Sequence, residues 1–97
     1  MNPAICEAIQ ARRVVRFYYG GGHRVVEPHC YGMSTAGHEV LRGYQTSGYS
    51  ESGESVGWKL FRVSEISGLE VTRETFAGAR PGYNPNDSAM ASIFCRL

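Results

Sequence analysis

The sequence has little of several features that would point directly to a class of function. It has no apolar run near the roughly 20 residues that a membrane-spanning helix needs, and its first residues lack the apolar stretch of a secretory signal. Its net charge is +1, so the strongly basic balance typical of non-specific nucleic-acid binding is missing as well. These absences predict a cytoplasmic protein that does not bind membranes.

Cysteine is also scarce, and its spacing carries no motif. The three cysteines are Cys6, Cys30 and Cys95. An odd number of widely separated cysteines does not predict a disulfide framework, so we expect reduced thiols. Together with His23, His29 and His38 they show no Cys-x-x-Cys or His-x-x-x-His spacing, so the sequence predicts no metal site and no cofactor.

Patterns that carry catalysis are missing too. The sequence shows no paired carboxylates, no nucleophilic serine elbow and no glycine-rich nucleotide loop. The run Gly20-Gly21-Gly22 is followed by His23-Arg24 and an extended segment, whereas a phosphate-binding loop is followed by Lys, Ser or Thr and a helix. We therefore interpret the run as a hairpin turn and expect a binding protein rather than an enzyme.

Among the basic residues, lysine is nearly absent. Lys59 is the only lysine, and the other nine basic residues are arginines. Arginine binds phosphate and carboxylate groups through two parallel hydrogen bonds and stacks on rings, so this bias favours a site for an anionic ligand. A GC-rich coding sequence would give the same bias, and the composition alone does not decide between the two.

The pattern of the chain predicts one helix and five short strands. Asn2 can cap a helix that begins at Pro3, and Ile5, Ala8, Ile9 and Ala11 form its apolar stripe. We expect the helix over residues 3–12 and strands over Val14–Tyr19, Arg24–Tyr31, Glu39–Gln45, Trp58–Val63 and Leu69–Thr72.

Three parts of the sequence are less regular. Pro28 cannot donate a ladder hydrogen bond, so it marks an edge position or a bulge in its strand. Residues 46–57 are rich in Ser and Gly and should form an exposed loop. Residues 76–87 hold several Gly and Pro and should be irregular, whereas the pattern of residues 88–97 fits a helix and a strand equally well.

These elements predict a mainly β fold with an N-terminal helix. Short strands joined by tight turns favour a strongly bent antiparallel sheet or a small SH3-like or Sm-like barrel. A chain of 97 residues has the length of one domain. We expect this single domain to cover residues 1–97, with the barrel over 14–76 and a C-terminal loop and tail over 77–97.

Three segments taken together resemble the WYL domain. They are Arg24-Val-Val-Glu-Pro28, Glu39-Val-Leu-Arg-Gly-Tyr44 and Leu60-Phe-Arg-Val-Ser-Glu-Ile66. The resemblance implies an Sm-like barrel of the kind found in bacterial transcription regulators, where it is thought to sense nucleotides or single-stranded nucleic acid. Val40 and Glu65 stand where that family has a tyrosine and an arginine of its proposed ligand pocket, so the resemblance implies the fold more directly than the ligand.

Alternation along two of the predicted strands brings arginines and rings to one face. If Leu41, Phe61 and Val63 point into the core, the outer face presents two arginines and two aromatic rings. These four residues are Arg42, Tyr44, Trp58 and Arg62. Such a face predicts a platform for a nucleotide or a short single strand. The alternative is that the helix or the tail covers it and the arginines stack on Trp58 as packing.

A third strand adds candidates for the same site. Glu27, His29 and Tyr31 alternate along it, so we expect them to share a face, with His29 and Tyr31 beside the ligand. His29 is either an anion ligand that titrates near neutral pH or a side chain hydrogen-bonded within the fold. Because His29 and Cys30 are adjacent, they should point to opposite faces, which disfavours a Cys–His catalytic pair.

The segment Arg80-Pro-Gly-Tyr-Asn-Pro85 is the most marked loop in the sequence. Its prolines make it stiff, and we expect Tyr83 to anchor it. It is either a clasp that packs back onto the sheet or a lid that presents Arg80 to an anion.

The sequence therefore predicts a regulatory module that binds a nucleotide, single-stranded nucleic acid or another anionic ligand. The alternative is a protein-interaction or oligomerisation module without a small ligand, which docks a regulator protein or a second copy of itself. Binding that weakens with salt would favour the first, and a dimer in solution would favour the second.

Overall fold

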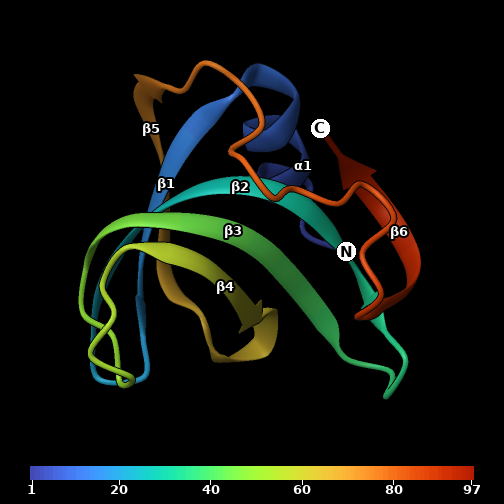
Figure 1. Ribbon diagram of the computed structural model, residues 1–97, viewed down its shortest axis with the longest axis horizontal. Helices are drawn as coiled ribbons and strands as arrows, with labels where there is room; N and C mark the ends of the chain where they lie inside the picture. The colour runs from blue at the N-terminus through green and yellow to red at the C-terminus, as the bar shows by residue number, and fades with distance from the viewer.

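A computed structural model describes residues 1–97 and shows a mainly β fold with one N-terminal helix (Figure 1). The six strands form one antiparallel sheet that is strongly bent but not closed. The elements are α1 (Pro3–Ala11), β1 (Arg13–Tyr19), β2 (Gly22–Ser34), β3 (Glu39–Gly48), β4 (Gly57–Arg62), the 3₁₀ turn η1 (Val63–Glu65), β5 (Ser67–Thr75) and β6 (Met90–Arg96). The predicted fold class is confirmed in its bent-sheet form.

The sheet is organised around β2, which at 13 residues is long enough to pair with three other strands. The strand order is β4-β3-β2-β1-β5, so β2 lies between β3 and β1. Where β1 has ended, β6 takes its place along the second half of β2, from Cys30 to Ser34. The end of the chain, whose sequence pattern fits helix and strand equally, is therefore a strand.

Helix α1 begins and ends where local chemistry requires. The Asn2 side chain accepts a hydrogen bond from the Ala4 backbone N–H at 3.0 Å, and Pro3 occupies the first turn. Arg12 ends the helix in the left-handed region, with φ 53°, so the predicted range is confirmed to within one residue. Of the predicted apolar stripe, Ile5, Ala8 and Ile9 are buried, whereas Ala11 in the last turn is exposed. No helix in the chain has the length and apolar character needed to cross a membrane.

All five predicted strands are present, and most are longer than predicted. The third extends to Gly48 because Ser47 and Gly48 pair with Val25 and Arg24 of β2, so the start of the predicted loop at residues 46–57 is strand. Their Ser and Gly content predicted a loop, but a neighbouring strand supplies the backbone partners. Val63 is not in β4 but begins η1, where it is partly buried against the core.

One hydrophobic core lies between α1 and the concave side of the sheet. Its central residues are Ile5, Ala8, Ile9, Val15, Phe17, Val26, Tyr31, Leu41 and Phe61. The predicted inward-facing Leu41 and Phe61 are among them, and the Phe17 and Phe61 rings meet edge to face at 4.9 Å. The alternation used to assign the two faces of β3 and β4 is thus confirmed.

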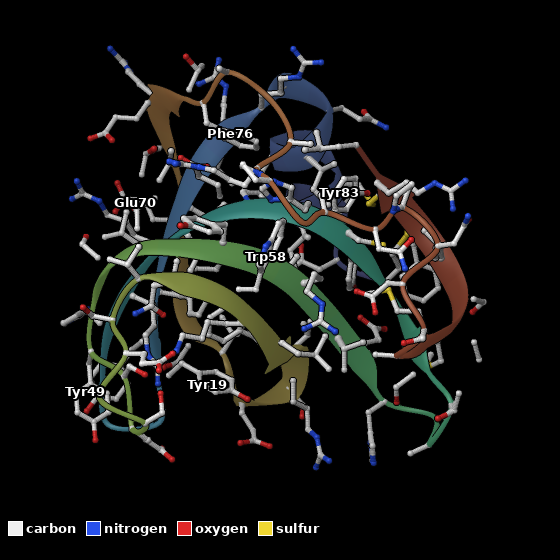
Figure 2. All side chains as sticks on the ribbon, in the orientation of Figure 1. Tyr19, Tyr49, Trp58, Glu70, Phe76 and Tyr83 are labelled. Carbon is white, nitrogen blue, oxygen red and sulfur yellow. A yellow bond between two sulfur atoms is a disulfide. The ribbon has the colours of Figure 1, made fainter.

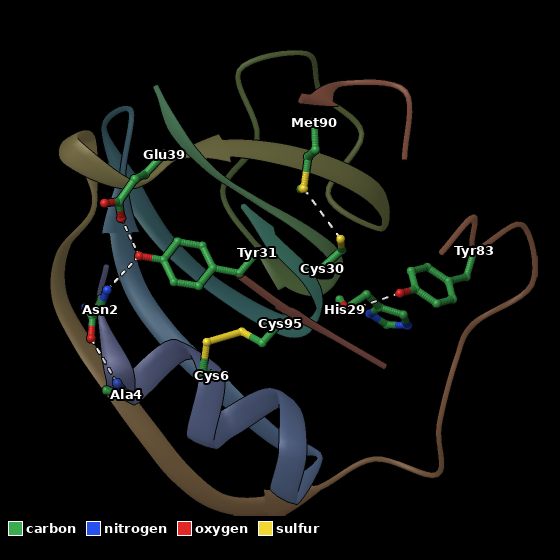
Figure 3. Close-up of a disulfide and its surroundings, with 10 residues drawn as sticks. All are labelled: Asn2, Ala4, Cys6, His29, Cys30, Tyr31, Glu39, Tyr83, Met90 and Cys95. Atoms are coloured by element: carbon green, nitrogen blue, oxygen red, sulfur yellow. Dashed lines mark hydrogen bonds between the residues drawn. A yellow bond between two sulfur atoms is a disulfide. The ribbon is translucent and has the colours of Figure 1, made fainter. Parts of the chain in front are cut away.

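A disulfide joins the two ends of the chain, contrary to the expectation of three reduced thiols. Cys6 of α1 and Cys95 of β6 are bonded, with their Cα atoms 5.7 Å apart (Figure 3). Pairing of β6 with β2 carries Cys95 to the helix, although the two cysteines are 89 residues apart in the sequence. Cys30 alone remains free, and it is buried.

Candidate functional site

The outer faces of β3 and β4 present the arginine and aromatic side chains that alternation predicts. Arg42 pairs in register with Leu60, and Tyr44 with Trp58, so these four side chains lie on the side of the sheet opposite to Leu41. The Tyr44 and Trp58 rings meet edge to face at 5.4 Å. We call the surface formed by Arg42, Tyr44 and Trp58 the outer face.

His29 lies on this face as alternation from Glu27 predicts, but a bulge in β2 moves Tyr31 to the opposite face. The register shifts between Pro28 and Cys30, which pair with the adjacent residues Gly43 and Arg42 of β3, so His29 is the extra residue of the bulge. His29 then contacts Trp58, with the ring centroids 4.7 Å apart, whereas Tyr31 pairs with Leu41 of the core. The prediction that His29 and Tyr31 share a face is therefore wrong, because the extra residue reverses the alternation.

Tyr31 has a structural place at the N-terminus instead. Its side chain is fully buried, and its hydroxyl accepts a hydrogen bond from the Asn2 backbone at 2.7 Å and donates one to the Glu39 carboxylate (Figure 3). Burial is the main reason that the pKa of Tyr31 rises to about 12, and the Glu39 hydrogen bond adds to it. Tyr31 thus fastens the start of α1 and is out of reach of a ligand on the outer face.

The bulge also places Cys30 on the outer side, as the register partner of Arg42, rather than opposite to His29 as predicted. The thiol is buried, with its sulfur 3.4 Å from the Met90 sulfur. Burial raises the pKa of Cys30 to about 11, and the nearby Asp87 carboxylate adds to this rise. The thiol is therefore protonated at neutral pH, a state in which a cysteine is a poor nucleophile.

The segment between β5 and β6, residues 77–89, lies over the outer face (Figure 1). We call it the clasp, because it packs onto the sheet, which is the first of the two alternatives that the sequence allows for this loop. Arg80 donates hydrogen bonds to both carboxylate oxygens of Glu27, at 2.7 and 3.0 Å, and its guanidinium lies 4.7 Å from the centre of the Tyr44 ring. The Arg80 side chain is thus directed at the sheet.

Tyr83 is the aromatic anchor of the clasp. Its ring stacks on Trp58 with the centroids 6.1 Å apart and the planes inclined by 22° (Figure 2). The indole Nε1–H of Trp58 donates to the Pro81 carbonyl at 3.0 Å. The Tyr83 hydroxyl has one proton to donate, which the carbonyls of His29 and Leu97 share at 3.3 and 3.4 Å. The clasp thus places a flat ring of its own against the tryptophan of the outer face.

Asp87 binds the arginine of the outer face from the other end of the clasp. Its two carboxylate oxygens accept hydrogen bonds from Arg42 at 2.7 and 3.2 Å. These bonds are the main reason that the pKa of Asp87 is lowered. The Asp87 side chain is 8% exposed, whereas that of Arg42 is 27% exposed, so part of the Arg42 side chain remains open to solvent.

His29 connects the sheet to the clasp. Its Nδ1 lies 2.8 Å from the Glu27 carbonyl, and its Nε2 accepts a hydrogen bond from the Arg80 backbone N–H at 3.1 Å. These partners fit a neutral ring that carries its proton on Nδ1. Burial is the main reason that the pKa of His29 is lowered, so the ring is neutral at pH 7. His29 is therefore a hydrogen-bonded part of the fold, one of the two roles that the sequence allows.

A hollow of about 270 Å³ remains between the clasp and the sheet. It is lined by Arg42, Trp58, Gly82, Tyr83, Asn84, Asp87 and Ser88. The lining combines a guanidinium, two aromatic rings and small polar groups. Such a set can bind an anionic group and stack a flat ring at the same time.

Arg62 lies outside this hollow. Its side chain is exposed, with its Nε 3.6 Å from the Glu65 carboxylate, and it lines a second hollow of about 430 Å³ with Val40 and Leu60. The predicted meeting of Arg42 and Arg62 in one basic platform is therefore not formed. The two arginines share a face of the sheet but serve different hollows.

The partners that sequence reasoning missed are the acidic ones, Glu27 and Asp87. Each accepts two hydrogen bonds from an arginine of the predicted site. The sequence held a weak signal, since Asp87 follows the stiff Pro- and Gly-rich stretch that the sequence predicts to be either a clasp on the sheet or a lid. No family model, curated protein or solved structure matches this chain.

Proposed function

We propose that this chain is a WYL-like ligand-binding module that takes an anionic ligand with a flat ring on its outer face. A nucleotide or a nucleotide at the end of a single strand has this chemistry. On this proposal the protein passes the state of its site to a partner in transcription control. It binds its ligand without converting it.

The observation that carries the proposal is Arg42 at the edge of the 270 Å³ hollow, with Trp58 beside it. Arg42 is the only basic side chain that lines the hollow, and 27% of its side chain is open to solvent. A charge-assisted hydrogen bond to an anion contributes about 1.5–3 kcal/mol, and a base stacked on an aromatic ring about 1–3 kcal/mol. Together these terms support binding of a small ligand.

The test is a titration by calorimetry with adenosine and guanosine monophosphates and a short oligonucleotide, at low and high salt. We expect binding that weakens as salt increases, because an anion is neutralised. We expect Arg42→Ala to reduce affinity at least about tenfold, the equivalent of one charge-assisted hydrogen bond. The matched control is Arg73→Ala, which removes an exposed arginine from β5, away from the hollow. Unchanged binding in Arg42→Ala would contradict the proposal.

A second candidate function, a protein-interaction or oligomerisation module, is favoured by one observation. Leu60 is 40% exposed on β4, at the edge of the sheet, and it lines the 430 Å³ hollow with Tyr19 and Val40. An exposed apolar residue beside an open hollow suits the side chain of another protein. Light scattering tests this: a dimer that Leu60→Ser converts to a monomer would support it, and a monomer throughout would count against self-association.

A further inference from the structure

The clasp brings to the outer face the same two chemical groups that the proposed ligand would bring. Tyr83 supplies a flat ring that lies on Trp58, and Asp87 supplies an anionic group that is bound through two hydrogen bonds by Arg42. Carboxylates and phosphates bind an arginine in the same forked geometry. The chain therefore fills its own site with a ring and an anion joined by a short linker.

We infer that the clasp is a built-in occupant of the ligand site, and that a ligand combining one flat ring with one anionic group displaces Tyr83 and Asp87. This inference rests on the proposed function and adds its regulation. In the free protein the clasp occupies Arg42 and Trp58 beside the hollow, and ligand binding releases it. Release of the clasp is then the signal that a partner protein can detect.

The bonding of the clasp suits reversible release. No backbone–backbone hydrogen bond joins residues 77–89 to β1, β2, β3, β4 or β5. Every hydrogen bond between the clasp and these strands involves a side chain or its ring, as for Asp87, Tyr83 and the Pro81 carbonyl. Breaking such contacts leaves the sheet ladder intact, so the clasp can lift while the domain stays folded.

Both ends of the clasp are fixed, which allows it to return to the same place. At one end the Phe76 backbone N–H donates to the Arg12 carbonyl at 2.9 Å. At the other end β6 pairs with β2 and is bonded to α1 through Cys95. Gly78 and Gly82 have φ values of 154° and 88°, which other residues rarely adopt, and they give the backbone between these ends two points of freedom.

The test is calorimetry with adenosine monophosphate on the parent, Asp87→Asn and Arg42→Ala. Asp87→Asn removes the internal anion while keeping the size of the side chain, so the site no longer has to be vacated by a charge. We expect Asp87→Asn to bind about tenfold more tightly than the parent, the gain produced by removing an internal competitor that occupies the site most of the time. We expect Arg42→Ala, alone or combined with Asp87→Asn, to bind adenosine monophosphate more weakly than the parent.

Further arms separate the two groups of the ligand and its two sources. Inorganic phosphate and adenosine each carry half of the proposed chemistry, and each should bind more weakly than adenosine monophosphate. A 5′-phosphorylated oligonucleotide that binds more tightly than the free nucleotide identifies a strand end as the source, whereas equal affinity identifies the mononucleotide. Tyr83→Ala is a second variant in which the clasp is weakened, and it should also bind adenosine monophosphate more tightly than the parent. It keeps the inference testable if Asp87→Asn does not fold.

Two results would overturn the inference, and they differ from each other. If the parent binds and neither Asp87→Asn nor Tyr83→Ala binds more tightly, then the clasp does not compete with the ligand, and the proposed function stands alone. If no ring-bearing anion binds the parent or either variant, the proposed function fails and the inference fails with it.

Discussion

His29 makes the most specific residue-scale prediction, because both of its ring nitrogens already have partners. Adding a proton to Nε2 would place an N–H against the Arg80 backbone N–H, and would charge a buried ring. The pKa of His29 is lowered from 6.5 by burial. At a pH between 6.5 and the lowered pKa, the unfolded chain therefore binds more protons than the folded one. The stability that this group contributes is present above pH 6.5 and is lost as the pH falls towards the lowered pKa.

We therefore expect the urea concentration at the unfolding midpoint to decrease when the pH is lowered from 7.5 to 5.5. The charged groups facing His29 are Glu27 and Arg80, which are paired with each other. Asp87 and Glu39 have pKa values lowered from 3.8 and 4.5, so their contributions are lost in more acidic solution, as the pH falls through these ordinary values towards the lowered ones. In His29→Gln, which does not titrate, the midpoints at pH 7.5 and pH 5.5 should be equal; a fall as large as the parent's would show that another group is responsible.

Residue-scale prediction from the sequence succeeded where alternation is uninterrupted. Leu41 and Phe61 lie in the core, and Arg42 and Trp58 lie on the outer face, as the period of two requires. It failed for Tyr31, because a single extra residue after Pro28 reverses the faces of everything that follows in β2. Pro28 indicated a bulge, but the residue at which the register shifts depends on the pairing with β3.

At the scale of elements, the close packing of β2 on β3 depends on Gly43. A Cβ atom at this position would lie 2.3 Å from Cγ1 of Val26, which is fully buried. We expect Gly43→Ala to lower the free energy of unfolding by about 1–3 kcal/mol through overpacking. Chemical denaturation measures this loss.

Val26→Ala provides the partner for a double-mutant cycle with Gly43→Ala. It removes the methyl group against which the new Cβ would press. The double variant should therefore lose less stability than the sum of the two single variants, by about 1 kcal/mol. Strictly additive losses would show that the strands separate instead of pressing on Val26.

The clasp makes a second element-scale prediction. Tyr83→Ala removes the ring stacked on Trp58 and the hydroxyl hydrogen bond shared by two carbonyls, so we expect a loss of about 1–3 kcal/mol of stability. Tyr83→Phe keeps the ring and should lose only about 1 kcal/mol. Equal losses in the two variants would mean that the ring contributes nothing to holding the clasp.

Elements were easier to predict than their lengths or their neighbours. The runs at Glu39–Gln45 and Trp58–Val63 alternate clearly, and strands form there. The last residues of the chain do not, because Met90, Ile93 and Phe94 fit a helix as well as a strand. Only the free edge of β2 decides between helix and strand. That edge is free because the pairing of β1 with β2 stops at Val26.

At the scale of the whole molecule, the disulfide closes nearly the entire chain into a loop. Cys6 and Cys95 are separated by 89 residues, and a loop of this size constrains the unfolded chain by about 4–5 kcal/mol in the chain-entropy description. We expect a reducing agent to lower the urea midpoint of the parent by a corresponding amount. The double variant Cys6→Ser and Cys95→Ser should match the reduced parent and not respond to the reducing agent.

Equal midpoints for the oxidised and reduced parent would contradict this account of the disulfide. The sequence could not reveal the pair, because widely spaced cysteines carry no information about which elements meet. Only the addition of β6 to β2 beside α1 brings them together. The same long-range assembly places the clasp on the outer face, which is why the acidic partners of the arginines were not predicted.

The central claim, that a ligand takes the place of the clasp on the outer face, is tested most directly by one NMR titration. The chain has a single tryptophan, so its indole Nε1–H gives one resonance, and that proton is bonded to the Pro81 carbonyl of the clasp. On addition of adenosine monophosphate we predict a shift of this resonance together with the backbone amides of the clasp, and no such shift in Arg42→Ala. An indole resonance that stays fixed while the nucleotide is raised to millimolar concentration would contradict the claim.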